Sequence, residues 1–158
     1  MTMETVHPRV LGYLGRALSL ELSAVQQYMT QASLLALWGD DGSADRFRQE
    51  TVEEMQHAER LVQQMLRLGV APAASQLKPV STARDLIGLL RLNIHLEDEL
   101  IRLYAEANRF CLLVSDQANA HFFHALWQEE ARHGEELEAW VQDLTGLERS
   151  LASQRVTF

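Results

Sequence analysis

Two copies of one spacing pattern constrain this chain more than any other feature of its sequence. In each half, a single glutamate lies 33 residues before a second glutamate, and a histidine follows that second glutamate three positions later. Side chains three positions apart share one face of a helix, so each Glu-x-x-His pair can present a carboxylate and an imidazole to the same metal ion. The repeat therefore predicts four helices that bring six side chains to one level. These are Glu21, Glu54 and His57 in the first half and Glu97, Glu130 and His133 in the second.

Apolar residues recur with the period of long helices over most of the chain. Leu11, Leu14 and Leu18, for example, follow one another at three- and four-residue steps. Only three prolines and eight glycines interrupt the 158 residues, which favours helices over sheet. Tracts of at most about 30 residues, or about 45 Å, suit a four-helix bundle. We expect helices at about Pro8–Leu37, Ala44–Leu68, Thr82–Val114 and Asp116–Leu144, with a short fifth helix at about Leu147–Arg155.

The links between these tracts predict how the helices are connected. Residues 38–43, WGDDGS, form a short break that suits two adjacent antiparallel helices. Residues 70–81, VAPAASQLKPVS, contain two of the three prolines and are too polar and broken for a helix, so they suit a long crossover. The sequence thus predicts an all-α protein with one domain over residues 1–158, in which the bundle occupies about residues 8–145.

Composition argues against several classes of function. The formal net charge of −8 disfavours nucleic acid as a partner, because phosphate binding needs basic patches, and it suits cations better. The single cysteine, Cys111, excludes an intrachain disulfide and a four-cysteine metal site. The sequence has no apolar run of about 18 residues that would predict a membrane span, and its first ten residues do not resemble a signal peptide. We expect a cytoplasmic protein with no membrane partner.

The two single glutamates lie among apolar neighbours, in LSLELSAV around Glu21 and NIHLEDEL around Glu97. Burying unpaired carboxylates is costly, and two divalent cations would offset the repulsion between four of them. Carboxylates with two imidazoles suit iron or manganese, with zinc as an alternative. One glutamate from each of two helices and Glu-x-x-His from each of the other two is the known pattern of di-iron carboxylate bundles. A third match, Glu4 to His7, precedes Pro8 near the N-terminus and is expected by chance.

Four short motifs extend this match to a known family. They are ELSAVQQY at residues 21–28, WG at 38–39, EEMQHAER at 53–60 and EEARH at 129–133. With them, the chain resembles the bacterioferritins, the haem-containing branch of the ferritins, from about Val10 to Leu144. The resemblance implies a ferritin-like bundle with a short fifth helix, assembled from twofold dimers into a hollow homo-oligomeric cage of 24 subunits. It also implies iron storage, in which a ferroxidase reaction oxidises Fe(II) with O2 or peroxide and Fe(III) mineral is deposited inside the cage.

The resemblance further implies roles for single residues. The metals would be held by Glu21 with His57 and by Glu97 with His133, and bridged by Glu54 and Glu130. Tyr28 corresponds to a tyrosine beside the metal centre that can donate an electron, and a core aromatic is the alternative. Tyr104 lies seven residues after Glu97 in the same way; it is interpreted as a core aromatic with a hydrogen-bonded hydroxyl, with a role like that of Tyr28 as the alternative. Met55 lies about 100° round the helix from Glu54 and so faces away from the metals. It would bind haem b shared between two subunits, or else serve packing alone.

The chain departs from the family pattern in several places. Gln49 and Glu50 stand where a histidine beside a glutamate is frequent on the cavity wall, and Glu136 stands where a tryptophan is common. The tail after Leu144 matches poorly, which puts the usual fourfold pore in doubt. The remaining mid-chain histidines have no clear family counterpart and are interpreted as surface or core residues. They are His95, His121 and His124.

Two other functions stay open at this point. One is a di-metal oxidase or peroxidase that stores no iron, and the other is a haem-carrying subunit of a mixed cage. Particle mass would separate storage from the first alternative, because a small oxidase need not form a cage. A small ferredoxin is the partner for iron release that the resemblance implies.

Overall fold

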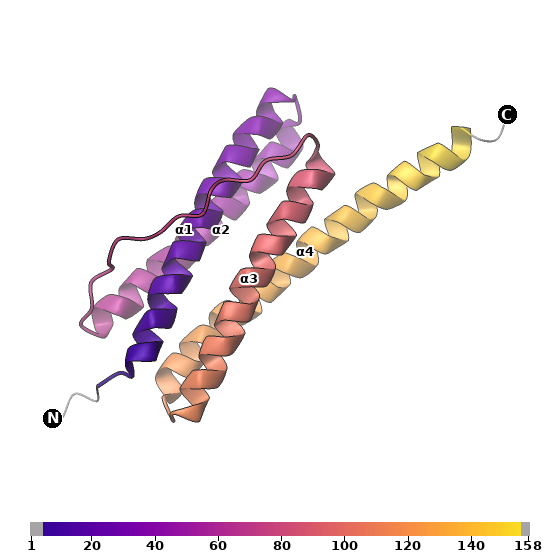
Figure 1. The fold of residues 1–158 in the computed structure, drawn as a ribbon. Coiled ribbons are helices and arrows are strands. Elements are labelled where there is room, and N and C mark those ends of the chain that lie inside the picture. Colours follow the sequence, from indigo (N-terminus) through magenta and orange to yellow (C-terminus); the bar gives the residue numbers. More distant parts are fainter. Residues whose placement is uncertain (1–4, 156–158) are drawn as a thin grey trace.

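Four long helices make up the structure. The computed structural model describes residues 5–155; residues 1–4 and 156–158 lie outside it. The helices are α1 (Pro8–Leu37), α2 (Asp41–Arg67), α3 (Leu86–Leu113) and α4 (Gln117–Arg155). They pack lengthwise, with α1 beside α2 and α3 beside α4 (Figure 1), and the described residues contain no strand. The predicted all-α four-helix bundle is confirmed.

Capping residues determine where the helices begin. The side chain of Asp40 accepts a hydrogen bond from the backbone N–H of Ser43, and that of Asp85 accepts one from Gly88. Such N-caps satisfy backbone donors that a helix leaves free. They explain why α2 begins three residues before the expected Ala44 and α3 four residues after the expected Thr82. Gly39, with φ of 84°, takes the left-handed conformation that ends α1.

The segment from residue 68 to residue 85 crosses the length of the bundle along α1, as predicted (Figure 1). Polar side chains of α1 hold its backbone. Ser19 and Ser23 accept hydrogen bonds from the backbone N–H groups of Gln76 and Lys78, at 3.2 and 2.9 Å. This side-chain support replaces the hydrogen bonds that a helix or sheet would supply to the crossover.

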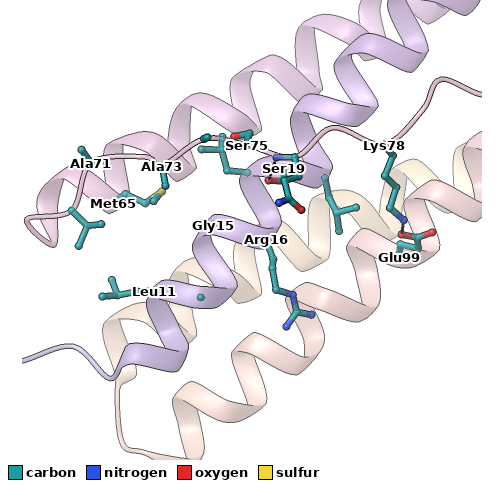
Figure 2. A pocket seen from close by; sticks show the side chains of 16 residues that line it. Leu11, Gly15, Arg16, Ser19, Met65, Ala71, Ala73, Ser75, Lys78 and Glu99 are labelled. Carbon is teal, nitrogen blue, oxygen red and sulfur yellow. Dashed lines mark hydrogen bonds and ion pairs between the residues drawn. The ribbon is translucent and has the colours of Figure 1, made fainter.

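A groove of about 660 Å³ remains between α1 and the crossover (Figure 2). Its lining includes Leu11, Met65 and the ion-paired Lys78 and Glu99. None of the six residues of the repeated glutamate–histidine pattern lines this groove.

The expected short fifth helix is wrong, because α4 continues as one helix of 39 residues to Arg155. Its C-terminal part extends beyond the other three helices (Figure 1). Gly146, which follows the expected helix end at Leu144, has no positive φ. A glycine inside a helix costs only about 1 kcal/mol relative to alanine, and the residues that follow it are good helix formers. Leu147 and Leu151 on this extension are 58% and 50% exposed.

Candidate metal centre

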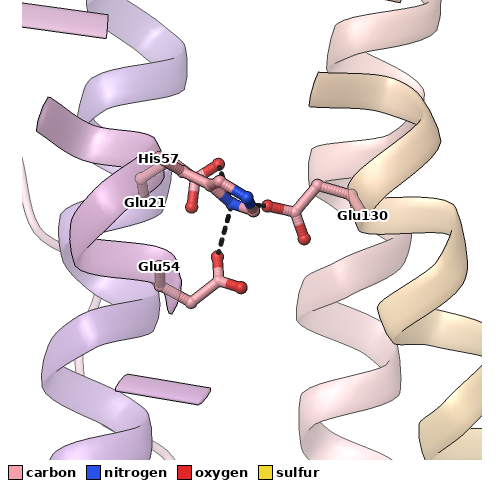
Figure 3. Close-up of side chains that lie close together, drawn as sticks. All are labelled: Glu21, Glu54, His57 and Glu130. Atoms are coloured by element: carbon pink, nitrogen blue, oxygen red, sulfur yellow. Dashed lines mark hydrogen bonds and ion pairs between the residues drawn. The ribbon is translucent and has the colours of Figure 1, made fainter. Parts of the chain in front are cut away.

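The six residues of the repeated pattern meet inside the bundle, and each is at most 4% exposed. Their ligand atoms form two groups, each with its atoms within 4.8 Å of one another. Glu54 and Glu130 belong to both groups, as residues that bridge two ions would. The first group is Glu21, Glu54, His57 and Glu130 (Figure 3), and the second is Glu54, Glu97, Glu130 and His133.

Each histidine contacts the glutamate on the opposite Glu-x-x-His helix. His57 Nδ1 lies 2.7 Å from Glu130 Oε1, and His133 Nδ1 lies 3.1 Å from Glu54 Oε1. His57 Nδ1 is also 3.6 Å from Glu21 Oε1. The imidazoles of α2 and α4 therefore point into the same carboxylate cluster from both sides.

Several buried carboxylate oxygens in this cluster have no hydrogen-bond partner. They are the Oε2 atoms of Glu21, Glu54, Glu97 and Glu130. A buried polar atom without a partner costs about 1–3 kcal/mol, and more if it is charged. Four such oxygens beside two imidazoles form a hard-donor set that divalent cations satisfy. These carboxylate oxygens without hydrogen-bond partners, together with the two imidazoles, thus fit two metal ions.

Burial and the close contacts within the cluster shift the pKa values of its carboxyl groups and imidazoles. Burial, followed by the charge of Glu21, raises the pKa values of Glu54 and Glu130 well above their ordinary range. Burial would also raise the pKa of Glu21, but hydrogen bonds with Glu54 and His57 outweigh it and lower that pKa. Burial lowers the pKa values of His57 and His133, yet their glutamate contacts raise them to about 10 and about 9. A cation that binds here must displace protons.

Two tyrosines at the centre donate hydrogen bonds to the outer glutamates. Tyr28 donates to Glu97 Oε1 at 2.8 Å, and Tyr104 donates to Glu21 Oε1 at 2.6 Å. Burial and then the charge of the accepting glutamate raise both phenol pKa values well above 10. A core aromatic with a hydrogen-bonded hydroxyl was expected for Tyr104, and the structure adds that the acceptor is Glu21 on α1. The sequence spacing placed Tyr104 on the face of Glu97 but did not show which segment lies opposite that face.

A third acidic group approaches His133 from outside. His133 Nε2 lies 2.5 Å from Glu53 Oε2, and Glu50 Oε2 lies 3.7 Å from Nδ1. Burial raises the pKa of Glu50 to about 7. The sequence marked Glu50 only as a departure from a family pattern, because glutamates at positions 50, 53 and 54 resemble an ordinary charged helix face.

Comparison with known proteins agrees with the fold and the ligand pattern. A family model described as a ferritin-like domain matches residues 11–147. The chain belongs to the ferritin family. Bacterioferritins of Rhodobacter capsulatus and Brucella melitensis are each 30% identical to it, over 84% and 83% of this chain and 83% and 81% of their own lengths. The predicted resemblance to bacterioferritins is confirmed.

Solved ferritin-family structures superpose closely on this chain. The structure of Rhodobacter capsulatus bacterioferritin, described as having a metal-free dinuclear site and a haem iron in a crystallographic special position, has a TM-score of 0.87 and 29% identity. It covers 90% of this chain and 89% of its own. Mycobacterium tuberculosis bacterioferritin has the same TM-score at 23% identity, over 96% of this chain and 95% of its own, which supports the fold alone.

Other predicted residues of this ferritin lie away from the metal centre. Met55 is 51% exposed, so it faces outward as expected; Val52 on the same helix and Met29 on α1 are 56% and 52% exposed. The remaining histidines join no metal group among residues 5–155. His95 is exposed and lies 3.8 Å from Glu99, and His124 packs edge-on against Trp127. His121 is exposed, and Glu4 of the third Glu-x-x-His match lies outside the described residues.

No described helix is both long and apolar enough to cross a membrane.

Proposed function

We propose that this ferritin oxidises Fe(II) at the buried cluster and stores the Fe(III) product as mineral inside a hollow homo-oligomer. The observation that carries the proposal is the set of four buried glutamate oxygens that have no hydrogen-bond partner and lie in one cluster with two histidines. The curated relatives that share most of the chain are bacterioferritins, which supports iron as the cation.

Each half of the cluster supplies the ligands for one substrate iron. Glu21 and His57 hold the first, and their counterparts Glu97 and His133 hold the second. The shared pair Glu54 and Glu130 bridges them, which keeps the two ions close enough to act together. Two Fe(II) ions supply two electrons, which with two protons reduce O2 to hydrogen peroxide, or hydrogen peroxide to water. Carboxylate oxygens are hard donors and therefore stabilise Fe(III) more than Fe(II).

Tyr28 supports this chemistry in two ways. Its hydroxyl donates to Glu97 Oε1 and so orients that carboxylate, as residues behind a metal ligand often do. Its phenol is fully buried, and only the carboxylate of Glu97 would separate it from a bound iron. The phenol can therefore supply one further electron when the oxidant needs it.

Haem b is the second cofactor in this proposal, with Met55 as its ligand. Met55 and Val52 on α2 and Met29 on α1 are exposed apolar side chains that could line a haem site. Arg48, one turn before Val52 and exposed, can pair with a haem propionate. A twofold interface would bring two copies of these side chains together and give haem two thioether ligands. Bound haem would supply a one-electron path for reducing stored Fe(III).

The resemblance to bacterioferritins also suggests how the subunits assemble and how stored iron is released. We propose a cytoplasmic cage of 24 subunits built from twofold dimers, reduced by a small ferredoxin for iron release. The exposed Leu147 and Leu151 on the straight end of α4 support contact with neighbouring subunits in such a cage. Light scattering tests the assembly directly, because 24 copies of an 18.0 kDa chain far exceed the mass of a dimer.

Stopped-flow absorbance tests the oxidation. The protein mixed with two Fe(II) per subunit and O2 should show a rapid phase of Fe(III) formation. Glu97→Ala combined with His133→Ala removes one terminal ligand and one imidazole, and the rapid phase should disappear. His95→Ala is the matched control, because His95 is exposed and belongs to neither group of ligands. A rapid phase that survives in the double variant would show that the centre is assigned wrongly.

A further inference from the structure

Each of the two tyrosines at the candidate centre donates a hydrogen bond to a glutamate on the other tyrosine's helix. Tyr28 on α1 donates to Glu97 on α3, and Tyr104 on α3 donates to Glu21 on α1. Each tyrosine follows, by seven residues, the glutamate that accepts from the other. Both rings are fully buried. The two phenols therefore stand in equivalent positions, one beside each outer metal ligand.

The equivalence continues one layer further out. The ring of Tyr28 lies 5.8 Å from that of Phe47, and the ring of Tyr104 lies 6.3 Å from that of Phe123. Phe47 precedes Glu54 by seven residues and Phe123 precedes Glu130 by seven. A phenylalanine thus lies beside each tyrosine, edge-on at Tyr28 with an interplanar angle of 80° and tilted at Tyr104 with an angle of 35°.

We propose that Tyr104 is a second electron donor to the reaction, acting with Tyr28 when O2 is the oxidant. This inference rests on the Fe(II) oxidation proposed above. Two Fe(II) ions give two electrons and the two phenols give one each, so one O2 accepts four electrons. Each phenol loses its hydroxyl proton and becomes a tyrosyl radical. These two protons and two from solvent complete two water molecules, and no hydrogen peroxide is released.

The hydrogen bond explains how Tyr104 can lose an electron inside the bundle. A phenol that loses an electron becomes a strong acid, so oxidation needs an acceptor already in place for its proton. Glu21 Oε1 is that acceptor at 2.6 Å. Because the ring is fully buried, no solvent path competes for the proton. The third tyrosine of the chain, Tyr13, donates instead to Glu106, which is not a metal ligand.

Rapid-freeze electron paramagnetic resonance after one turnover tests the inference. Wild type, Tyr28→Phe, Tyr104→Phe and the double variant are each loaded with two Fe(II) per subunit and mixed with O2. The tyrosyl signal should fall about twofold in either single variant and vanish in the double variant, since each phenol supplies one of the two extra electrons. Hydrogen peroxide should rise in the same order, toward one molecule per two Fe(II) in the double variant. Tyr13→Phe is the matched control and should resemble wild type.

Two further measurements separate electron donation from structural support and from failure of the proposed function. Anaerobic Co(II) titration of Tyr104→Phe, followed by absorption of the bound ion, should still show two ions per subunit. Loss of Co(II) binding, or radical and peroxide yields equal to those of wild type, would overturn the donor role of Tyr104. If wild type itself lacks rapid Fe(II) oxidation, the proposed function is wrong. If wild type oxidises Fe(II) rapidly but Tyr104→Phe gives the same tyrosyl signal as wild type, only the donor role of Tyr104 is contradicted.

Discussion

The imidazole rings of His57 and His133 stack with their centroids 5.6 Å apart and their planes 22° from parallel. One ring comes from α2 and the other from α4, and each Nδ1 contacts a glutamate on the opposite helix. The candidate centre therefore joins the α1–α2 pair to the α3–α4 pair. Metal binding at this point should act on the stability of the whole bundle.

Redox-inert divalent metal should stabilise the fold. An ion that binds only the native state adds about 2.7 kcal/mol when its free concentration is 100 times its dissociation constant. We expect Co(II) or Zn(II) to raise the thermal unfolding midpoint, as measured by circular dichroism in the presence and absence of a chelator.

Glu130→Gln provides the control for this stabilisation. Burial raises the pKa of Glu130 well above its ordinary range, so a charge at this position is costly without metal, and glutamine keeps the size of the side chain without that charge. The variant should keep its metal-free midpoint and lose most of the metal-dependent increase. An equal increase in wild type and variant would place the metal elsewhere.

Metal affinity should rise with pH. In the metal-free protein the pKa values of His57 and His133 are raised to about 10 and about 9, and those of Glu54 and Glu130 are also raised. At pH 6 to 8 the two imidazoles hold protons, whereas metal ligands must be deprotonated. Each displaced proton should strengthen apparent binding by roughly tenfold per pH unit.

Calorimetry measures the displaced protons directly. Titrating Co(II) in buffers of different ionisation enthalpy gives the number released per ion, which should be positive throughout this range. A pH-independent affinity with no proton release would contradict the protonation of the metal-free cluster.

Replacing Met55 by leucine should remove haem without unfolding the protein. This volume-conserving change should cost under about 1.5 kcal/mol if Met55 serves packing alone. If the thioether is the haem ligand, Met55→Leu should assemble and oxidise Fe(II), yet lose Soret absorbance after haem reconstitution and release iron more slowly on reduction. Met29→Leu, at a similarly exposed methionine, is the control. Unchanged haem stoichiometry in Met55→Leu would leave packing as its role.

The sequence predicted that the six glutamate and histidine side chains meet, because helical spacing converts directly into geometry. A three-residue step places Glu54 and His57 on one face, and the 33-residue repeat sets the depth of the helices that carry Glu21 and Glu97. The fifth helix was predicted wrongly because Gly146 is a weak stop signal, and only tertiary contacts decide whether a helix continues.

Contacts between distant segments were the hardest part to predict. The polar residues of α1 at positions 19, 23, 27 and 31 recur every four residues, which marks a helix face. Their partners on the crossover and on α3 are 50 or more residues away. The same limit hid the bond from Tyr104 to Glu21, since spacing shows which side chains share a face but not which segment covers that face.

The buried amide of Asn93 leads to the last prediction. Asn93 accepts a hydrogen bond from Gln27 at 2.8 Å and donates one to Gln31 at 2.7 Å, and it is fully buried. Gln27 and Gln31 in turn hold the backbone of Ser81 in the crossover. Asn93→Ala leaves Gln27 Nε2 and Gln31 Oε1 without their hydrogen-bond partner. Each such buried group should cost about 1–3 kcal/mol.

Asn93→Ala should therefore lower the unfolding free energy and loosen the crossover before the bundle unfolds. Hydrogen exchange should accelerate at the backbone amide of Ser81, which donates to Gln27, while the amides in the middle of α4 keep their protection. Gln63→Ala, on the exposed face of α2, should change neither quantity appreciably. If Asn93→Ala instead speeds exchange equally in α4 and the crossover, the amide network supports the bundle as a whole and does not specifically hold the crossover.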